Sequence, residues 1–411
     1  MRIAIAGPIS VRGLSEFLDT PAESLPVGHD GAPLLNTLIT ALIKRGYEVS
    51  AYTLDVDISN NGESIFTALG TNGLRVYVGP YRSHSFRFNH GKPGRMLDMF
   101  RYERQALLEM MARDKSDIIH AHWTYEFALA AIDSGLPYVI TAHDSPLAVL
   151  RHTPSLYRLG RYFMARRVYR RAKLVTAVSP YMKERIQRYA KSPIRVISNP
   201  IPYHVLEKID QVTCKRREVN KPRIAMVLNG WGKLKNPKPA LKAFALLRDK
   251  FPEAQLYCFG RHYGKDDEAQ QWAISQGISE GIEFIGPLPH HELLDRIRNM
   301  DILLHPSLEE SFGLSLVEAM AVCVPVIGGD RSGAVPWVLD NGRAGVLTNV
   351  SSPEAICHAM SGLLNNNEAY EHIIKLARDR VDKLFIPDAI VSQYEEIYNK
   401  ALSTNQNRVG D

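Results

Sequence analysis

Short apolar runs alternate with longer amphipathic stretches along the whole chain. In the first half the runs are "RIAIAG", "EVSAYT", "LRVYVG", "DIIHAH", "YVITAHD", "LVTAVS" and "IRVIS", and helix-length stretches such as "PLLNTLITALIKRGY" lie between most of them. Runs that are apolar throughout are typical of parallel strands buried on both faces of a sheet. The pattern therefore predicts an α/β fold.

The same pattern begins again after a charged and irregular segment near residues 200 to 221. The second series is "RIAMVLNG", "QLYCFG", "IEFIG", "DILLHPS", "VPVIGG" and "AGVLT". A chain of 411 residues also exceeds what one core usually supports. We expect two Rossmann-like parallel-sheet domains facing a central cleft, at residues 1–205 and 206–387, with a last helix at 388–403 that packs back on the first domain.

Composition is that of a soluble globular protein, with 45% hydrophobic and 23% charged residues. No run of eighteen apolar residues occurs, and "MRIAIAGPI" resembles a first strand more than a signal peptide. The four cysteines are widely spaced without a C-x-x-C pair, so we expect neither a metal site nor a disulfide scaffold. The expected location is the cytoplasm, either free in solution or peripheral at the inner face of a membrane.

Basic residues cluster in one segment, although the whole chain carries a formal charge of only +6. Residues 151–173 contain eight lysines and arginines and no acid, together with Tyr157, Tyr162, Phe163 and Tyr169. A helix here could lie on an anionic membrane surface. Alternatively, its aromatic side chains pack into the first domain and its arginines are solvated. We expect no nucleic-acid partner.

The common nucleotide motifs are missing from this sequence. The first strand-to-helix turn, "AGPISVRG", has no G-x-G-x-x-G, and no G-x-x-x-x-G-K-[ST] occurs, which disfavours dinucleotide dehydrogenases and P-loop enzymes. The segment "HPSLEESFGLSLVEAMA" offers another phosphate site, where a strand leads into a helix. The free N–H groups of Phe312, Gly313 and Leu314 would suit a diphosphate at the helix N-terminus.

Two carboxylates flank this helix start. If the helix begins near Gly313, Glu310 can face a sugar, while Glu318 lies one to two turns inside, within reach of ribose hydroxyls. The alternative is ordinary capping, because Ser315-Leu-Val-Glu318 matches the capping box [ST]-x-x-E.

These residues resemble glycosyltransferase family 4, the retaining GT-B enzymes. The resemblance rests on "ESFGLSLVE", the E-x7-E motif from Glu310 to Glu318, and extends to "RGYEV", "TAHD" and "VISNP". It implies a hexosyl-type transferase that uses a UDP- or GDP-linked sugar donor and a saccharide or lipid-linked acceptor, with no metal cofactor. Such enzymes act in the biosynthesis of bacterial envelope, lipopolysaccharide or exopolysaccharide.

The resemblance also implies site residues. Lys235, with Lys233, matches the basic pair that neutralises the donor diphosphate. His143 matches a histidine that faces the donor sugar, with Asp144 either orienting it or capping the next turn. Gly31, or alternatively Gly28, matches a glycine loop near the diphosphate.

Three residues depart from the family pattern. Trp231 stands where an arginine is frequent, Cys323 where glycine is usual, and Trp337 where glutamate is frequent.

Two short patterns resemble metal-binding motifs, but another explanation is favoured for each. His120 and His122 in "HAHW" are spaced like a metal pair, yet alternation along a buried strand explains them better without a third ligand. The "DVD" at residues 55–57 favours a solvated loop.

Other functions compatible with the motifs are a nucleotide-sugar-binding protein without turnover and a GT-B epimerase or phosphorylase. The products formed from a nucleotide sugar would distinguish these from a transferase.

Overall fold

A computed structural model describes residues 1–29, 32–60, 65–89, 91–209 and 221–406. The chain forms two compact units. Unit 1 comprises Met1–Pro200 with Pro387–Asp411, and unit 2 comprises Ile201–Ile386. These limits lie five residues and one residue before the expected boundaries at 205 and 387.

Unit 1 is built on an eight-stranded sheet with the order β3-β4-β2-β1-β5-β6-β7-β8. Its strands are β1 (Arg2–Ala6), β2 (Glu48–Asp55), β3 (Phe66–Leu69), β4 (Arg75–Pro80), β5 (Ile118–His122), β6 (Tyr138–Ala142), β7 (Val175–Ala177) and β8 (Arg195–Val196). All neighbours pair in parallel except β3, which is antiparallel to β4. Every strand except β3 corresponds to one of the apolar runs of the sequence. β3 is a half-exposed edge strand, so its composition carries no such signal.

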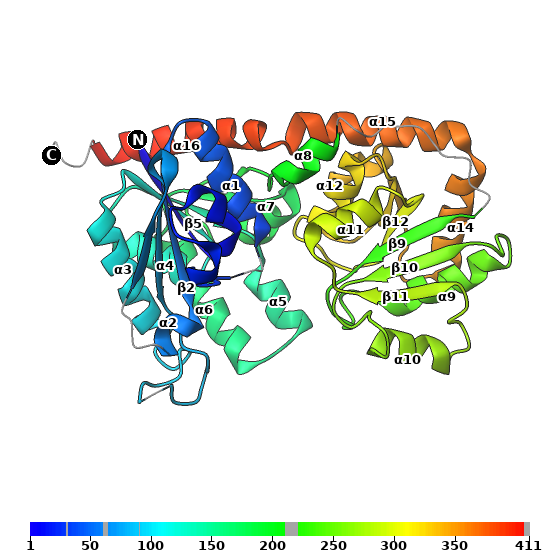
Figure 1. Ribbon diagram of the computed structural model, residues 1–411, viewed down its shortest axis with the longest axis horizontal. Helices are drawn as coiled ribbons and strands as arrows, with labels where there is room; N and C mark the ends of the chain where they lie inside the picture. Colours follow the sequence, from blue (N-terminus) through cyan, green and yellow to red (C-terminus); the bar gives the residue numbers. More distant parts are fainter. Residues whose placement is uncertain (30–31, 61–64, 90, 210–220, 407–411) are drawn as a thin grey trace. The chain divides into compact units, whose positions relative to one another are not determined.

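Helices cover both faces of this sheet (Figure 1). α1 and α16 pack together, with α1 against β2 and α16 against β5 and β6. α4 packs between α3 and α6, with α3 also against β4 and α4 against β5. The α-helices of unit 1 are α1 (Pro33–Lys44), α2 (Val56–Asn60), α3 (Arg101–Asp114), α4 (Glu126–Asp133), α5 (Pro146–His152), α6 (Leu156–Arg171), α7 (Pro180–Gln187) and α16 (Pro387–Gln406).

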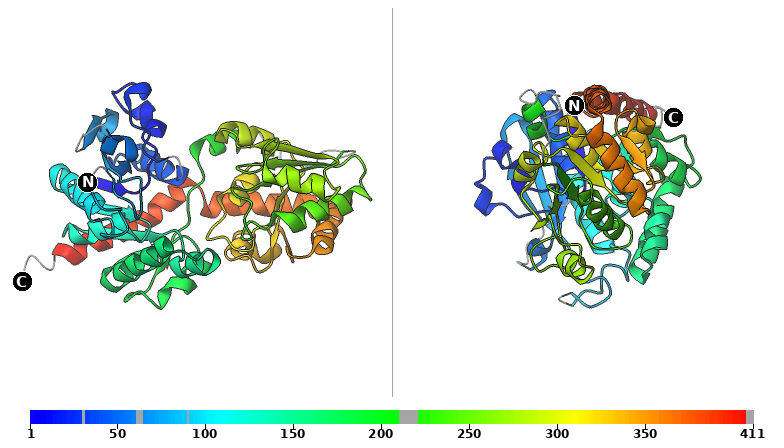
Figure 2. Two further views of the ribbon diagram at one scale, coloured as in Figure 1. Left: turned by 90° about the horizontal axis from the view of Figure 1, so that it is seen from below. Right: turned by 90° about the vertical axis from the view of Figure 1, so that its right-hand side faces the viewer.

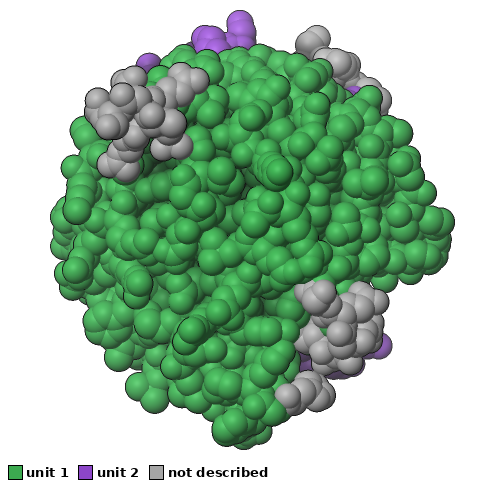
Figure 3. Space-filling model, turned by 90° about the vertical axis from the view of Figure 1, so that its left-hand side faces the viewer, with its two compact units in different colours: residues 1–200, 387–411 green, residues 201–386 purple. Residues whose placement is uncertain are grey.

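The last helix, α16, is an integral part of unit 1 although it follows unit 2 in the sequence. In Figure 2 the red helix lies beside elements of unit 1, and Figure 3 colours the described parts of unit 1, α16 included, in green. Tyr394 and Tyr398 are buried and bond with Thr141 and His120 on the sheet. Arg45, the C-cap residue of α1, forms ion pairs with two carboxylates of α16.

Unit 2 has a six-stranded parallel sheet with the order β11-β10-β9-β12-β13-β14. The strands are β9 (Arg223–Val227), β10 (Gln255–Phe259), β11 (Ile282–Gly286), β12 (Ile302–His305), β13 (Val326–Gly329) and β14 (Val346–Thr348). All six correspond to apolar runs of the sequence. Successive strands are added on one side of β9 up to β11 and then on its other side from β12 to β14. Open α/β sheets bind ligands at such a switch point.

Two helical layers enclose the sheet of unit 2. α9 packs against α14 on one side, and α12 packs against α8, α11 and α15 on the other. The helices are α8 (Tyr203–Ile209), α9 (Pro237–Arg248), α10 (Glu268–Ser275), α11 (His290–Ile297), α12 (Leu314–Ala321), α13 (Val335–Val338), α14 (Pro353–Asn365) and α15 (Asn367–Leu384).

The cysteines of unit 2 correct one expectation. Cys258 and Cys357 are free and buried, but Cys323 is disulfide-bonded. Cys323 also has a φ of +57°, a backbone region that favours glycine, which explains why a glycine is usual at this position. Among the described residues, no helix combines the length and apolar character needed to cross a membrane.

Candidate active site

The clearest cluster of polar groups in unit 2 lies where the chain leaves β9 and β12. The loop after β9 carries Lys233 and Lys235, and the segment after β12 carries Glu310 and leads into α12. Because β9 and β12 are neighbours in the sheet, their carboxyl ends bring these two loops together. This edge is therefore the candidate ligand site that the sequence predicted.

The helix α12 begins as expected at Leu314, with Gly313 as its N-cap residue. Gly313 has a φ of +89°, and an added Cβ would approach Leu316 Cδ1 to 2.7 Å, so the position requires glycine. Gly313, as the N-cap residue, has no side chain that could cap this helix. The capping-box alternative is therefore wrong, because Ser315 lies inside the helix and not at its cap.

Backbone amides are what the helix start offers to a ligand. The Phe312 side chain is buried and packs on Phe385 and Trp337, with ring centroids 5.5 and 6.3 Å away. Trp337, where the family pattern frequently has glutamate, thus belongs to an aromatic cluster that holds the helix start in place. Any ligand contact of Phe312 at this tip must come from its main chain.

Glu310 lies at the centre of a charged cluster. Its Oε1 is 2.7 Å from Lys235 Nζ and 3.3 Å from His305 Nε2. Burial alone raises the pKa of Glu310, but His305 and Lys235 outweigh burial and lower the pKa to about 2. Glu310 is therefore ionised at neutral pH, and it holds the Lys235 ammonium beside the start of α12.

The loop that carries Lys235 is pinned by Asn236. This residue has a φ of +51°, and its side-chain amide donates to the carbonyl oxygens of Pro306 (3.1 Å) and Val350 (2.8 Å). Lys233 is exposed on the same loop. Trp231 does not supply a charge to this loop. Its ring packs on those of Tyr263 and Trp272, with ring centroids 5.9 and 5.8 Å apart.

Glu318 is buried one turn inside α12 and has a histidine partner. Its Oε1 lies 2.8 Å from His290 Nε2, and His290 Nδ1 lies 2.6 Å from His204 Nε2. Burial lowers the pKa of His290, but the bond to Glu318 and its charge raise it more, so the net shift is upward. A protonated His290 can donate to both neighbours, which leaves the second Glu318 oxygen for a ligand.

In unit 1, His143 follows β6 and is nearly buried. Its Nε2 lies 2.9 Å from His122 Nδ1, and its ring stacks on Trp123 with centroids 4.3 Å apart. Burial lowers the pKa of His143 to about 3, so this imidazole is neutral at physiological pH. Asp144 does not pair with it: the Tyr125 hydroxyl donates to both Asp144 oxygens, at 3.1 and 3.0 Å.

The glycine loop of unit 1 is only partly described. Gly31 lies outside the described residues. Gly28 has a φ of +72°, and a Cβ there would meet the Ile9 carbonyl oxygen at 2.4 Å. Its N–H donates to Asp55 Oδ2 at 2.7 Å. Asp55 is thus a buried acceptor at the end of β2, which corrects the solvated loop expected for residues 55–57.

His120 and His122 are completely buried on β5, as strand alternation predicted. His120 bonds to Tyr398 and Thr141, at 2.8 and 2.7 Å. Within the described ranges, no group of three or more His, Cys, Asp or Glu side chains has the arrangement of a metal site.

The basic segment 151–173 forms the end of α5 and all of α6. Three of its four aromatic residues face the protein: Tyr169 is buried, Tyr162 is half-buried, and Tyr157 lines a pocket. Only Phe163, 51% exposed, faces solvent, together with Leu156 and Leu159. The packing interpretation therefore holds for most of the aromatic residues, and a shorter apolar strip remains outside.

Sequence reasoning missed several residues that shape these sites. Asn236, His290 and His305 each contact a predicted residue or its loop. The sequence positions of two of them could have indicated a site, since His305 ends an apolar strand and His290 follows the Pro-rich turn "GPLP". Their partners come from strands and helices that only the assembled sheet brings together.

Comparison with known proteins gives consistent relatives for both halves. A profile described as "Glycosyl transferases group 1" matches residues 211–380, and one described as "Glycosyltransferase Family 4" matches residues 34–204. An N-acetyl-alpha-D-glucosaminyl L-malate synthase of Bacillus anthracis is 28% identical over 73% of this chain and 79% of its own. A D-inositol 3-phosphate glycosyltransferase of Corynebacterium glutamicum is 29% identical over 95% and 97%.

A solved structure shares the fold. Alr3699/HepE of Anabaena, in complex with UDP-glucose, superposes with a TM-score of 0.67 at 17% identity, covering 97% of this chain and 100% of that chain.

Proposed function

Because this chain belongs to glycosyltransferase family 4 and has the GT-B fold, we propose that it moves a hexosyl group from a UDP- or GDP-linked sugar to a saccharide or lipid-linked acceptor, with retention at the anomeric carbon. The observation that carries the proposal is the Lys235–Glu310 pair beside the start of α12, where the N-cap residue is a glycine. The HepE complex with UDP-glucose supports a donor of this class.

The donor diphosphate binds at the tip of α12. The N–H groups of Phe312, Gly313 and Leu314 donate to its oxygens, and the positive end of the helix dipole favours its charge. Lys235 turns its ammonium from Glu310 toward the phosphate, while Lys233 adds a second charge from the exposed side of the loop. These cations stabilise the negative charge that develops as the diphosphate leaves.

The two glutamates hold the sugars of the donor. Glu310 accepts hydrogen bonds from hydroxyls of the transferred sugar, since its low pKa keeps it an acceptor at neutral pH. Glu318, oriented by His290, accepts from the ribose with its second oxygen. Both carboxylates belong to one segment of unit 2, so they bind one ligand and do not flank a scissile bond as glycosidase carboxylates do.

The transfer step needs no nucleophile from the enzyme. The bond between the anomeric carbon and the diphosphate oxygen breaks, and the acceptor oxygen forms its bond on the same face. The acceptor proton passes to the departing phosphate oxygen. His143, neutral because it is buried, donates or accepts one hydrogen bond at the donor sugar. We expect this chemistry to need no metal cofactor, because lysines and amides supply the positive potential. Full activity in EDTA would support this expectation, and restoration by Mg²⁺ or Mn²⁺ would refute it.

An exposed strip on α6 supports a lipid-linked acceptor and a location at a membrane surface. Leu156, Leu159 and Phe163 lie on one exposed side of α6, next to the exposed Arg166 and Arg170. Apolar side chains flanked by arginines suit the surface of an anionic bilayer. We place the protein in the cytoplasm, peripheral to the inner membrane face, in synthesis of envelope, lipopolysaccharide or exopolysaccharide.

Vesicle sedimentation tests this location. The wild type should sediment with vesicles that contain phosphatidylglycerol and remain in solution with phosphatidylcholine alone. The double substitution Leu159→Ser and Phe163→Ser should abolish sedimentation while the thermal unfolding temperature stays unchanged. Equal sedimentation with both lipids would refute the membrane contact.

A thermal-shift screen of UDP- and GDP-linked sugars, followed by product analysis, tests the function itself. The cognate donor raises the unfolding temperature because it binds only the folded state. With this donor and an acceptor mixture, a transferase yields a glycoside and free nucleoside diphosphate. An epimerised nucleotide sugar, a sugar phosphate, or donor binding without any product would refute transfer.

A further inference from the structure

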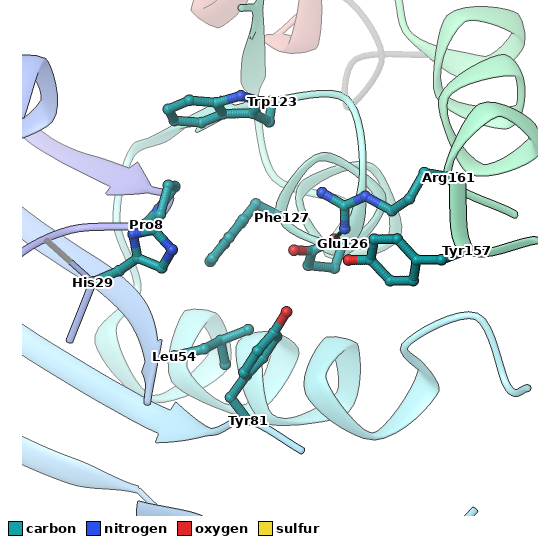
Figure 4. A pocket seen from close by; sticks show the side chains of 9 residues that line it. All are labelled: Pro8, His29, Leu54, Tyr81, Trp123, Glu126, Phe127, Tyr157 and Arg161. Carbon is teal, nitrogen blue, oxygen red and sulfur yellow. Dashed lines mark hydrogen bonds and ion pairs between the residues drawn. The ribbon is translucent and has the colours of Figure 1, made fainter. Parts of the chain in front are cut away.

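A pocket in unit 1 lies at the carboxyl edge of its sheet. It has a volume of about 320 Å³ and is lined by ends of β2, β4 and β5 and by the starts of α4 and α6. Figure 4 shows the ring of Trp123 on one side, with Tyr81 across from it and Glu126, Tyr157 and Arg161 at one end. The volume suits one sugar-sized ring.

The Trp123 indole is held in place by its surroundings. Its backbone has a φ of +62°, a conformation that is rare for a large side chain and is found mostly where function requires it. The backbone N–H of Trp123 donates to the Thr141 carbonyl oxygen at 3.0 Å, and one face of the indole stacks on His143. A fixed aromatic wall next to the residue proposed to meet the donor sugar suits the apolar face of another ring.

The cation of the pocket is already neutralised. Arg161 forms an ion pair with Glu126, and its guanidinium lies 3.5 Å from the centre of the Tyr125 ring. The two charged side chains are only 18% and 7% exposed. Burial lowers the pKa of Arg161, but Glu126, the neighbouring tyrosines and Asp144 raise it more, so the guanidinium stays charged beside the Glu126 carboxylate.

The residues that line the pocket therefore provide little unpaired positive charge for an anion. Apart from His29, Arg161 is the only basic side chain among the described residues that line the pocket. An entering phosphate or carboxylate would meet Glu126 beside the guanidinium, and bringing like charges together in a buried site is costly. A neutral hydroxyl group has no such penalty, because it can donate to Glu126 or exchange hydrogen bonds with the hydroxyls of Tyr81 and Tyr157.

We infer that this pocket takes the acceptor as an uncharged, hydroxyl-bearing ring against Trp123, and that it rejects acceptors whose bound end carries a phosphate or carboxylate. The inference rests on the proposed transferase function. It separates this chain from the two relatives described above, whose names contain malate and inositol 3-phosphate, both of them acids. The Glu126–Arg161 pair is the feature that sets the specificity.

Binding of matched neutral and anionic rings tests the inference. The probes are myo-inositol and 1D-myo-inositol 3-phosphate, which differ by one phosphate, together with the methyl glycosides of glucose, mannose and galactose, measured by ligand-observed NMR titration of the full chain. In the wild type, at least one neutral ring should bind about tenfold or more tighter than inositol 3-phosphate. Equal or tighter binding of the phosphate, or no binding of any neutral ring, would overturn the inference.

Two substitutions sharpen the result. Glu126→Gln frees Arg161 and should improve inositol 3-phosphate binding about tenfold or more, whereas Glu109→Gln, which removes the carboxylate of an exposed ion pair on α3, should not. Trp123→Ala should lose the neutral ring, and Trp123→Phe should retain it. No gain of phosphate binding in a cooperatively unfolding Glu126→Gln protein contradicts the inference. If that variant does not fold, the wild-type comparison still decides.

Failure of this inference is distinguishable from failure of the proposed function. UDP and GDP titrated into the same samples report on the site in unit 2. Loss of nucleotide binding would count against the transferase proposal, while the neutral and anionic rings report on unit 1 alone.

Discussion

Removal of the Lys235 ammonium is the substitution that most directly probes the donor site. In the free protein Lys235 Nζ lies 2.7 Å from Glu310, and its side chain is 32% exposed. In Lys235→Ala the diphosphate loses a charge-assisted hydrogen bond worth about 1.5–3 kcal/mol. That loss weakens nucleotide binding by roughly ten- to 150-fold.

A second effect acts in the same direction. Without Lys235, the Glu310 carboxylate keeps His305 as an ion-pair neighbour, and the negative charge of Glu310 then opposes the incoming diphosphate. The fold itself should change little, because partly exposed ion pairs contribute about 0–1 kcal/mol to stability. Transfer should be abolished while the unfolding temperature falls by only a few degrees.

Isothermal titration of UDP and GDP, with initial transfer rates, measures the effect. Lys242→Ala is the matched control, since this exposed lysine lies on α9 close in sequence but outside the site. Lys235→Arg should restore part of the binding, because charge returns with a different geometry. Near wild-type nucleotide binding and turnover in Lys235→Ala would remove this residue from the donor site.

Three further predictions concern the start of α12. Gly313→Ala should cost about 1–3 kcal/mol of stability and abolish donor binding, because φ is positive and the new Cβ meets Leu316; an unchanged unfolding curve would contradict this. The depressed pKa of Glu310 contributes stability that is fully present above pH 4.5 and is lost as pH falls toward about 2, so Glu310→Gln should flatten the acid-unfolding profile measured by circular dichroism. The raised pKa of His290 stabilises the fold fully below pH 6.5, and this contribution is lost as pH rises through the raised value. His290→Gln, which keeps a donor to Glu318, should remove that slope, and an unaltered slope would exclude His290 as its source.

Much of the architecture could be predicted because parallel strands are apolar on both faces. Every strand of unit 2, and every strand of unit 1 except the half-exposed β3, corresponds to an apolar run. The start of α12 was equally readable, since a glycine between a strand and a helix allows the positive φ found at Gly313.

The partners of the site residues could not be predicted in the same way. The pairing of Lys235 with Glu310 spans 75 residues, and that of Glu318 with His290 spans 28. The first depends on the neighbouring ends of β9 and β12, and the second on the packing of α11 against α12, and local patterns encode neither. The pocket pair of Glu126 and Arg161 was missed for this reason, because the basic segment suggested solvated arginines.

The most direct measurement is a crystal structure of the protein with its cognate nucleotide sugar. The account predicts diphosphate oxygens within hydrogen-bond distance of the Phe312, Gly313 and Leu314 amides, with Lys235 Nζ moved from Glu310 onto a phosphate oxygen. A bound donor whose diphosphate lies away from the tip of α12, with the Lys235–Glu310 pair intact, would contradict it.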